Sequence, residues 1–484
     1  MRPQLTRRAR NPWRFDAVAL ITVWMACLFL IPQKWVLPGG GSIARPAIAV
    51  GLLCAVLYAA SRMVPAMVPR GRNPVALGLW GYGTLVVVSF AMSYNRDLYN
   101  FEVSAAVREI LLTASMIGIA LLTAGSIRDR ERLETLLKRS VGFTTAVAVV
   151  AALQFYFQYD LVEKVQFPGL KLTSDFLTSG VRSGFERAKG TTDHAIELGV
   201  VMAMAMPVAV HYALHEPDKK KARRYWVATL MIMSTIPMSV SRSGIVAAAV
   251  SMGFLVSVWG QRQMLRAAIG GVVGVIMIYI SSPTLLGSIR SLFSALDSDP
   301  SIEGRTDDYE IAFDFVAQRP WFGRGAGTWG ADTNLLLDNQ ILLSLLEIGW
   351  IGVAILCFMY ISGISTGRKI RRTAPDDTTR HLGQALAGAI ASGFITLFFV
   401  DGLFFQIYVG LCFFYIGAVG ATYRMMHTQP VRAEVEAVAK KRALLSRRHA
   451  AESRPRWWTV AFADDLPALF EERAEIRAER RTRA

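Results

Sequence analysis

Cationic and carboxylate side chains occur beside long apolar segments of this sequence, where they could do chemistry. TIPMSVSRSGIVAAAV, residues 235–250, holds Arg242 with no carboxylate within a dozen residues. Asp338 and Asn339 stand where another apolar segment begins, and Glu347 lies inside it. An unpartnered arginine in lipid costs about 2.5–3.5 kcal/mol on insertion scales. Arg242 therefore either reaches lipid headgroups or belongs to a functional site.

More cationic residues fall in two long polar links. EGRTDDYEIAFDFVAQRPWFGRGAGTW contains Arg305 and Arg324, and ERAKGTTDHAIELG contains Arg187 and His194. An arginine guanidinium matches phosphate oxygens through two parallel hydrogen bonds. The pattern predicts a site for an anionic group, such as a lipid diphosphate, near the headgroups.

These residues also have structural interpretations. Asp338 could cap the helix that follows, and His194 could mark a helix start. Glu347 could orient an arginine or simply pack between helices. GRGAGT, residues 323–328, could be a plain turn, or its backbone N–H groups could donate hydrogen bonds to an oxyanion.

Membrane helices must position these side chains. Hydrophobic residues make up 53% of the 484 residues and charged residues 19%, with a mean hydropathy of +0.35. Soluble domains hold about a quarter charged residues. Apolar segments of about 17–25 residues have bilayer-spanning length. The sequence predicts an all-α polytopic membrane protein with about twelve transmembrane helices. They lie near residues 15–31, 43–60, 74–92, 104–124, 141–157, 194–213, 225–240, 243–259, 267–283, 339–362, 383–400 and 403–424.

Basic residues predict the orientation. The net charge is +16. Strongly basic links such as HEPDKKKARR alternate along the chain with links that contain few basic residues. This alternation places both termini in the cytoplasm and explains the charge without a nucleic-acid partner. The first apolar segment lacks a small-residue cleavage site, so we interpret it as a retained span. The four cysteines lie in apolar segments without metal-ligand spacing, and no metal is predicted.

This topology predicts a transmembrane catalytic domain over residues 1–425 and a charged, helical cytoplasmic tail over 426–484. Two long links, about 158–193 and 284–338, fall outside the cytoplasm and are expected to be ordered.

The second of these links is expected to carry a short amphipathic helix. Asp307 and Glu310 have capping-box spacing, which predicts a helix with Arg305 just before its N-terminus. A helix start offers free N–H groups to anions.

SVSRSG, KGTTDHAIELGVVMAMAMP, GRTDDYEIAFDFVAQRPWFGRGAGTW and DNQILLSLLEIGWIG resemble signature segments of the O-antigen ligase and polymerase superfamily, from about 187 to 355. The resemblance implies a GT-C-like helical fold and glycan transfer at the outer face of a bacterial cytoplasmic (inner) membrane. The implied donor is an undecaprenyl-diphosphate-linked glycan, used without nucleotide sugar, metal or other cofactor.

The resemblance also implies roles for individual residues. Arg242 and Arg305 match arginines expected to hold the diphosphate, with Arg324 as a further charge. Many members have His-Asn where this chain has Asp338-Asn339. Asp338 could take the proton of the acceptor hydroxyl instead, or it could be a cap, with His194 or no general base acting. The substitution favours the polymerase branch or a relative that acts on another envelope glycan.

The leading hypothesis is a metal-independent inverting glycosyltransferase that polymerises lipid-linked repeat units. Arg187, His194, Asn339 and Glu347 would help to bind the donor or the acceptor. A ligase passing the glycan to lipid, wall polymer or protein stays open. So do a transporter or flippase of an anionic lipid and a scaffold in a glycan-assembly complex. Transporters carry charges at mid-membrane, whereas the ionisable residues here lie mostly in links.

Overall fold

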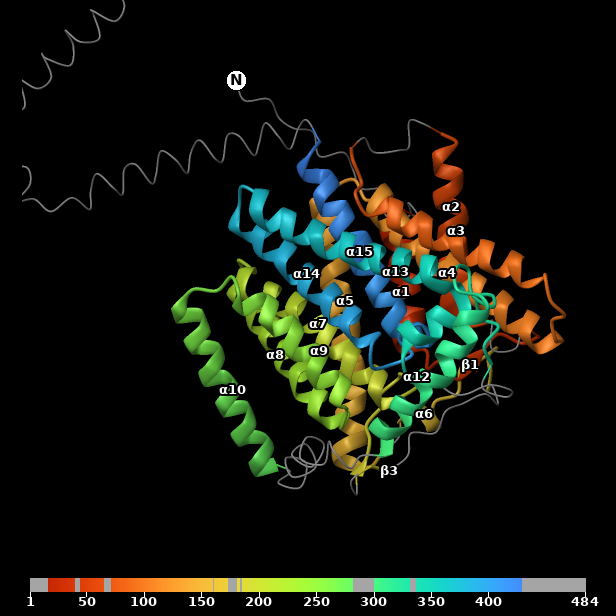
Figure 1. The fold of residues 1–484 in the computed structure, drawn as a ribbon. Helices are drawn as coiled ribbons and strands as arrows, with labels where there is room; N and C mark the ends of the chain where they lie inside the picture. The colour runs from red at the N-terminus through yellow and green to blue at the C-terminus, as the bar shows by residue number, and fades with distance from the viewer. Residues whose placement is uncertain are drawn as a thin grey trace, which may run out of the picture. The chain divides into compact units, whose positions relative to one another are not determined.

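Long α-helices dominate the part of the chain that the structure, a computed structural model, describes (Figure 1). That part comprises residues 16–39, 44–64, 71–159, 161–172, 181–182, 185–281, 300–330 and 337–428. The long helices are α1 (Ala17–Leu30), α2 (Pro46–Arg62), α3 (Ala76–Ser93), α4 (Asn100–Ser126), α5 (Arg130–Phe157), α7 (Ala195–His215), α8 (Lys219–Met238), α9 (Arg242–Val256), α10 (Gln261–Ser281), α12 (Pro300–Gln318), α13 (Gln340–Thr373), α14 (Asp377–Thr396) and α15 (Gln406–Met426).

Each predicted span overlaps one of these helices, and α12 is the additional one. Six helices are long and apolar enough to cross a membrane: α3, α4, α5, α7, α13 and α15. α1, α2 and α9 are apolar but shorter. The structure thus confirms a mostly helical protein with several candidate membrane spans, and the total of twelve stays a prediction. Almost all of the predicted tail, residues 429–484, lies outside the described residues.

α7 and α15 form the centre of the bundle. The most apolar window of α15 is 100% buried and that of α7 is 94% buried, against 39% for α3 and α5. Because both helices are covered by other helices, their ends are held firmly. The two N-termini contribute residues to the candidate site.

Two glycines bring the start of α7 against the start of α9. A Cβ built on Gly244 would lie only 2.9 Å from the Cα of Gly199, so neither position has room for a larger side chain. Small residues allow such close helix contact in membranes. The turn between α8 and α9, residues 239–241, therefore lies beside the first turns of α7.

α13 is broken at Gly349, whose φ of 68° and ψ of −173° are not helical. The broken helix binds residues 320–329, here called the insertion loop. A break frees backbone groups, which must find other partners inside a protein. The bonds run from Arg324 N to Leu346 O (2.7 Å), Gly325 N to Glu347 O (2.9 Å), Trp350 N to Pro320 O (2.8 Å) and Ile351 N to Trp321 O (3.3 Å).

The helix expected in the second long link is present, but its predicted start is wrong. α12 begins at Pro300, so Arg305 and Asp307 lie inside the helix rather than at its N-terminus. Proline is well suited to the first helical position because it has no N–H to satisfy there. The expected position of Arg305 just before the helix start is therefore wrong. The side chains of residues 300–308 lie outside the described part.

Short β-contacts hold the links at the same end of the bundle. β1 (Trp35–Val36) pairs antiparallel with β2 (Lys171–Leu172), and β3 (Val181–Arg182) with β4 (Phe185–Glu186). α6 (Leu161–Lys164) and the 3-10 helix η4 (Gly402–Phe404) complete the described elements. The β1–β2 pair ties the α1–α2 link to the long link before α7.

Candidate functional site

His194 caps α7 through its own ring. Its Nδ1 accepts a hydrogen bond from Ile196 N at 3.1 Å, and the ring stacks on Phe405 with centroids 6.2 Å apart. Because Nδ1 uses its lone pair in the cap, neutral His194 carries its proton on Nε2. Burial, followed by the charge of Arg187, lowers the pKa of His194 to about 4. At neutral pH this residue is a hydrogen-bond donor and not a general base.

Asp338 lies beside His194 and does not cap α13. Asn339 is the cap, because its Oδ1 accepts from Ile341 N (3.0 Å) and Leu342 N (3.2 Å). The Asp338 side chain is exposed and interacts electrostatically with His194. The capping interpretation of Asp338 is therefore wrong, because the residue after it caps α13.

Asp401, between α14 and η4, is a second carboxyl near Asp338. It was not predicted from the sequence as a site residue. Burial, followed by the charge of Asp338, raises the pKa of Asp401 to about 7. A carboxyl with a pKa near neutrality is well matched to proton transfer. The available signal was an aspartate in the two-residue link, Asp401-Gly402, between two predicted spans.

Arg187 and Arg242 meet at the α8–α9 turn although they are far apart in the sequence. The buried Arg187 donates from Nε to Ser239 O at 3.0 Å. Arg242 is half-buried and is the first residue of α9, directly after the cap Ser241. Arg187 also interacts electrostatically with His194. The structure thus brings Arg187 close both to His194 and to the turn that precedes Arg242.

Glu197 was not predicted and fixes the surroundings of His194. It is 1% exposed, and its carboxylate accepts from Ile407 N (2.8 Å) and Tyr408 N (3.2 Å) at the start of α15. Asp193 N also donates to it, at 2.9 Å. A carboxylate at a helix N-terminus satisfies N–H groups that lack helical partners. Glu197 therefore fixes the start of α15 against the start of α7.

Arg45 and Gln33 extend the same network. Gln33 donates from Nε2 to Glu197 at 3.1 Å, and Arg45 donates to Gln33 Oε1 at 2.9 Å. Arg45 also pairs with Asp193 at 3.4 Å. The link between α1 and α2 thereby supports the segment that carries His194.

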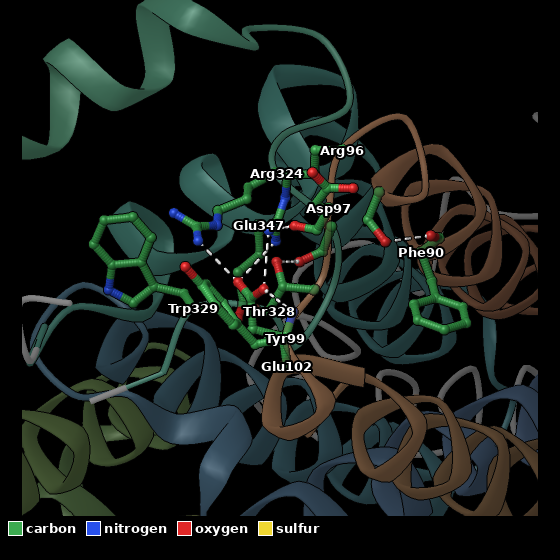
Figure 2. A network of polar contacts seen from close by, with 11 residues as sticks. Phe90, Arg96, Asp97, Tyr99, Glu102, Arg324, Thr328, Trp329 and Glu347 are labelled. Atoms are coloured by element: carbon green, nitrogen blue, oxygen red, sulfur yellow. Dashed lines mark hydrogen bonds and ion pairs between the residues drawn. The ribbon is translucent and has the colours of Figure 1, made fainter. Parts of the chain in front are cut away.

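A second polar group surrounds Glu102 at the start of α4 (Figure 2). Its carboxylate is 1% exposed and binds Arg96 through two 2.9 Å bonds. Arg324 donates to the same carboxylate at 2.8 Å and lies over the Trp329 ring at 5.9 Å. Two arginines share one carboxylate, so one positive charge is left over. The guanidinium of Arg324 is already bound by Glu102. A contact between Arg324 and substrate therefore stays a prediction.

Glu347 binds the backbone of the insertion loop and also interacts electrostatically with Arg108. Its carboxylate accepts from Trp329 N (3.3 Å) and Gly327 N (Figure 2). The other loop amides bind backbone or hydroxyl oxygens. They are Gly323 N to Arg319 O, Arg324 N to Leu346 O, Gly325 N to Glu347 O, Ala326 N to Ser89 Oγ and Thr328 N to Gly325 O. The amides of residues 323–329 therefore do not face an external oxyanion, because each of them binds an oxygen of the protein.

α12 connects the two polar groups. Asn339 Nδ2 donates to Tyr309 Oη at 2.9 Å, and Phe315 lies edge-on to Trp329 with centroids 5.2 Å apart. Arg305 precedes Tyr309 by about one helical turn. Arg305 thus lies on the α12 backbone about one turn before the residue that contacts Asn339.

These features define a multi-pass helical membrane protein with arginines and carboxylates gathered at one end of its helices. Residues 227–357, from α8 into α13, match the family model described as O-antigen ligase. The predicted resemblance to the O-antigen ligase and polymerase superfamily is confirmed. The match supports a ligase- or polymerase-like function in glycan synthesis on lipid-linked glycans. No curated protein matches the chain.

Replacing Glu102 by glutamine is expected to destabilise the protein by about 1–3 kcal/mol, because Arg96 and Arg324 lose a charged acceptor. Thermal unfolding in detergent would measure the loss. Glu134→Gln is the matched control, because its i,i+4 pair with Arg130 is far more accessible to solvent and contributes at most about 0.5 kcal/mol. Equal effects of the two variants would contradict a structural function of the Glu102 group.

His194 should make stability depend on pH. Its pKa is about 4 in the folded protein against an ordinary 6.5, so the unfolded chain takes up the proton first as the pH falls. From pH 7 to 5 the native protein should lose up to about 2 kcal/mol relative to His194→Asn, which keeps a capping oxygen. Asp401, whose pKa is raised, acts with the opposite sign, so only this comparison is informative. If the stability of the native protein and of His194→Asn depended on pH in the same way, the lowered pKa of His194 would be disproved.

Proposed function

We propose that this protein is a membrane glycosyltransferase that polymerises oligosaccharide repeat units carried on undecaprenyl diphosphate. The reaction would occur outside the bacterial cytoplasmic membrane, with both chain termini in the cytoplasm. The observation that carries the proposal is the position of Asp338. It lies within the O-antigen ligase match, does not cap α13, and neighbours His194 and Asp401.

The proposed reaction is a single displacement. Asp338 removes the proton of the acceptor hydroxyl, whose oxygen attacks the anomeric carbon of the donor. The bond from that carbon to the diphosphate breaks, and the diphosphate leaves with the electron pair. Arg242 and Arg305 stabilise the growing negative charge, and the protein holds the acceptor in line. One displacement inverts the anomeric configuration, and no step uses a metal ion.

His194 and Asn339 would act on the substrates only as hydrogen-bond donors. The Nε2–H of His194 can bind a sugar or phosphate oxygen, because its Nδ1 is used in the helix cap. Asn339 holds Tyr309 and caps α13, so it positions its neighbour Asp338. Arg187 anchors the turn before Arg242 and adds positive charge there.

A ligase that passes the whole glycan to lipid, wall polymer or protein is the closest alternative. The same residues would serve it, and only the acceptor would differ. Asp338 in place of the family histidine favours the polymerase.

A transporter or flippase of an anionic lipid is the alternative from another class. The break in α13 is the feature that favours it, since transporters use discontinuous helices. However, the insertion loop binds both sides of this break through backbone hydrogen bonds. The break is therefore filled by protein rather than left for a substrate.

Arg242→Ala is expected to slow glycan transfer by about 10²–10³-fold, because the leaving diphosphate loses a fixed donor. The assay incubates purified protein with lipid-linked glycans and follows the products on a gel. Native protein should give a ladder, and Arg223→Ala, an exposed arginine on α8, should give the same ladder.

The products distinguish the alternatives. A single transfer to an added acceptor would indicate a ligase. No product from authentic donor and acceptor, together with movement of intact donor across vesicles, would indicate the transporter. Full activity of Arg242→Ala would remove this arginine from the site.

A further inference from the structure

Three histidines meet at the end of α7 opposite to His194. His211 and His215 lie four residues apart on α7, and His381 comes from α14. One ring nitrogen from each lies within 4.8 Å of the others, and His211 and His381 are only 2% and 6% exposed. At 1.5 Å per residue, α7 separates this cluster from the candidate site by about 25 Å.

The spacing of these nitrogens suits a metal ion. The Nδ1 atoms of His211 and His381 are 3.1 Å apart. Zinc binds imidazole nitrogen at about 2.0–2.1 Å, which puts two ligands of a tetrahedral ion about 3.4 Å apart. Histidines at positions i and i+4 of one helix face are a recurring zinc-binding pair. A slight opening of the cluster would admit the ion.

A hydrogen bond prepares one of the ligands. The Nδ1–H of His215 donates to the backbone carbonyl of His211 at 3.2 Å, since a carbonyl oxygen can only accept. The lone pair of His215 is therefore on Nε2 in the neutral ring. Metal-binding histidines commonly use the other ring nitrogen in this way, which fixes their tautomer.

We propose that His211, His215 and His381 bind one Zn²⁺ ion and so join α7 to α14. Three imidazoles favour zinc and similar transition metals over magnesium or calcium, which prefer oxygen ligands. Water would complete the four ligands of the ion. The ion takes no part in the proposed glycan transfer, and the assignment does not depend on that function.

The charges around the cluster set its affinity. Arg130 and Lys138 interact with His211, and Arg371 with His381, so these cations oppose the ion. Asp377 interacts with His215 and favours the ion. The cations reduce the affinity for Zn²⁺ below that of a site surrounded by carboxylates. We expect a dissociation constant in the micromolar range.

Trp259 competes with the metal ion. Its Nε1–H donates to His381 Nε2 at 3.3 Å, so without metal the proton of neutral His381 lies on Nδ1. Zinc at Nδ1 moves that proton to Nε2, where it faces the Trp259 N–H. This hydrogen bond must therefore break when zinc binds. Trp259→Phe removes the competitor and should bind zinc more tightly.

The test is a zinc titration of the full chain, purified without a histidine tag, stripped with chelator and held in nanodiscs. Calorimetry should show one Zn²⁺ per chain. His215→Ala and His381→Ala should each weaken binding at least tenfold, and Trp259→Phe should strengthen it several-fold. His427→Ala is the control, because this histidine contacts Tyr423 instead. Zinc should also raise the melting temperature of the native protein but not of His215→Ala.

Two results would overturn the proposal. One is the absence of saturable binding at 100 micromolar zinc in native protein and in Trp259→Phe. The other is equal binding by native protein and His215→Ala, which would place any zinc elsewhere. If His381→Ala fails to fold, Trp259→Phe and His215→Ala still decide the matter, since neither removes a fully buried histidine.

Discussion

Asp338→Asn should slow glycan transfer by about 10²–10⁴-fold while the protein folds normally. Asparagine keeps the size of the side chain but cannot accept the hydroxyl proton. Normal folding is expected because Asn339, not Asp338, caps α13. Initial rates of ladder formation and the melting temperature would measure the two parts of this prediction.

Two further variants make the test specific. Asp314→Asn changes an exposed carboxylate on α12 and should leave the rate unchanged. Asp401→Asn distinguishes the two neighbouring carboxyls. If Asp338→Asn retained most of the activity and Asp401→Asn lost it, the base would be Asp401, whose pKa of about 7 suits that task.

Gly349→Ala should destabilise the protein by at least about 2–4 kcal/mol and release the insertion loop. An added Cβ would lie 2.4 Å from the backbone carbon of Trp321, and the positive φ of 68° disfavours any other residue. The loop would lose its bonds to both sides of the break. Thermal unfolding and protease cleavage between 319 and 330 would report the two effects.

Gly253→Ala on α9 is the matched control for this prediction. It has nothing within 4 Å of a built Cβ, and alanine is the better helix former. Stability should be unchanged or raised by up to about 1 kcal/mol. A similar loss in both variants would mean that the break in α13 has no special need for glycine.

The helices were predictable because bilayer thickness sets the length of an apolar segment. Each predicted span overlaps a helix, with ends displaced by a few residues or, as in α5 and α13, by about a dozen. Those two helices continue into polar residues, RERLETLLKR and TGRKIRRT, where apolar length gives no boundary. The start of α12 was misplaced for a related reason, since Asp307 and Glu310 imitate a helix cap inside the helix.

The candidate site was predictable only in part. Arg187, Arg242, His194 and Asp338 stood out because charge is costly beside lipid. Their partners did not, because contacts between distant segments leave no local pattern. Arg324 binds Glu102, which is 222 residues away in the sequence.

The contacts of Glu197 imply an order of events during synthesis. This buried carboxylate binds amides of α15, the last helix in the described part of the chain, and Gln33 from the α1–α2 link. A nascent chain that ends before Ile407 leaves the carboxylate without those donors. The neighbourhood of His194 can therefore take its final form only after α15 has been inserted.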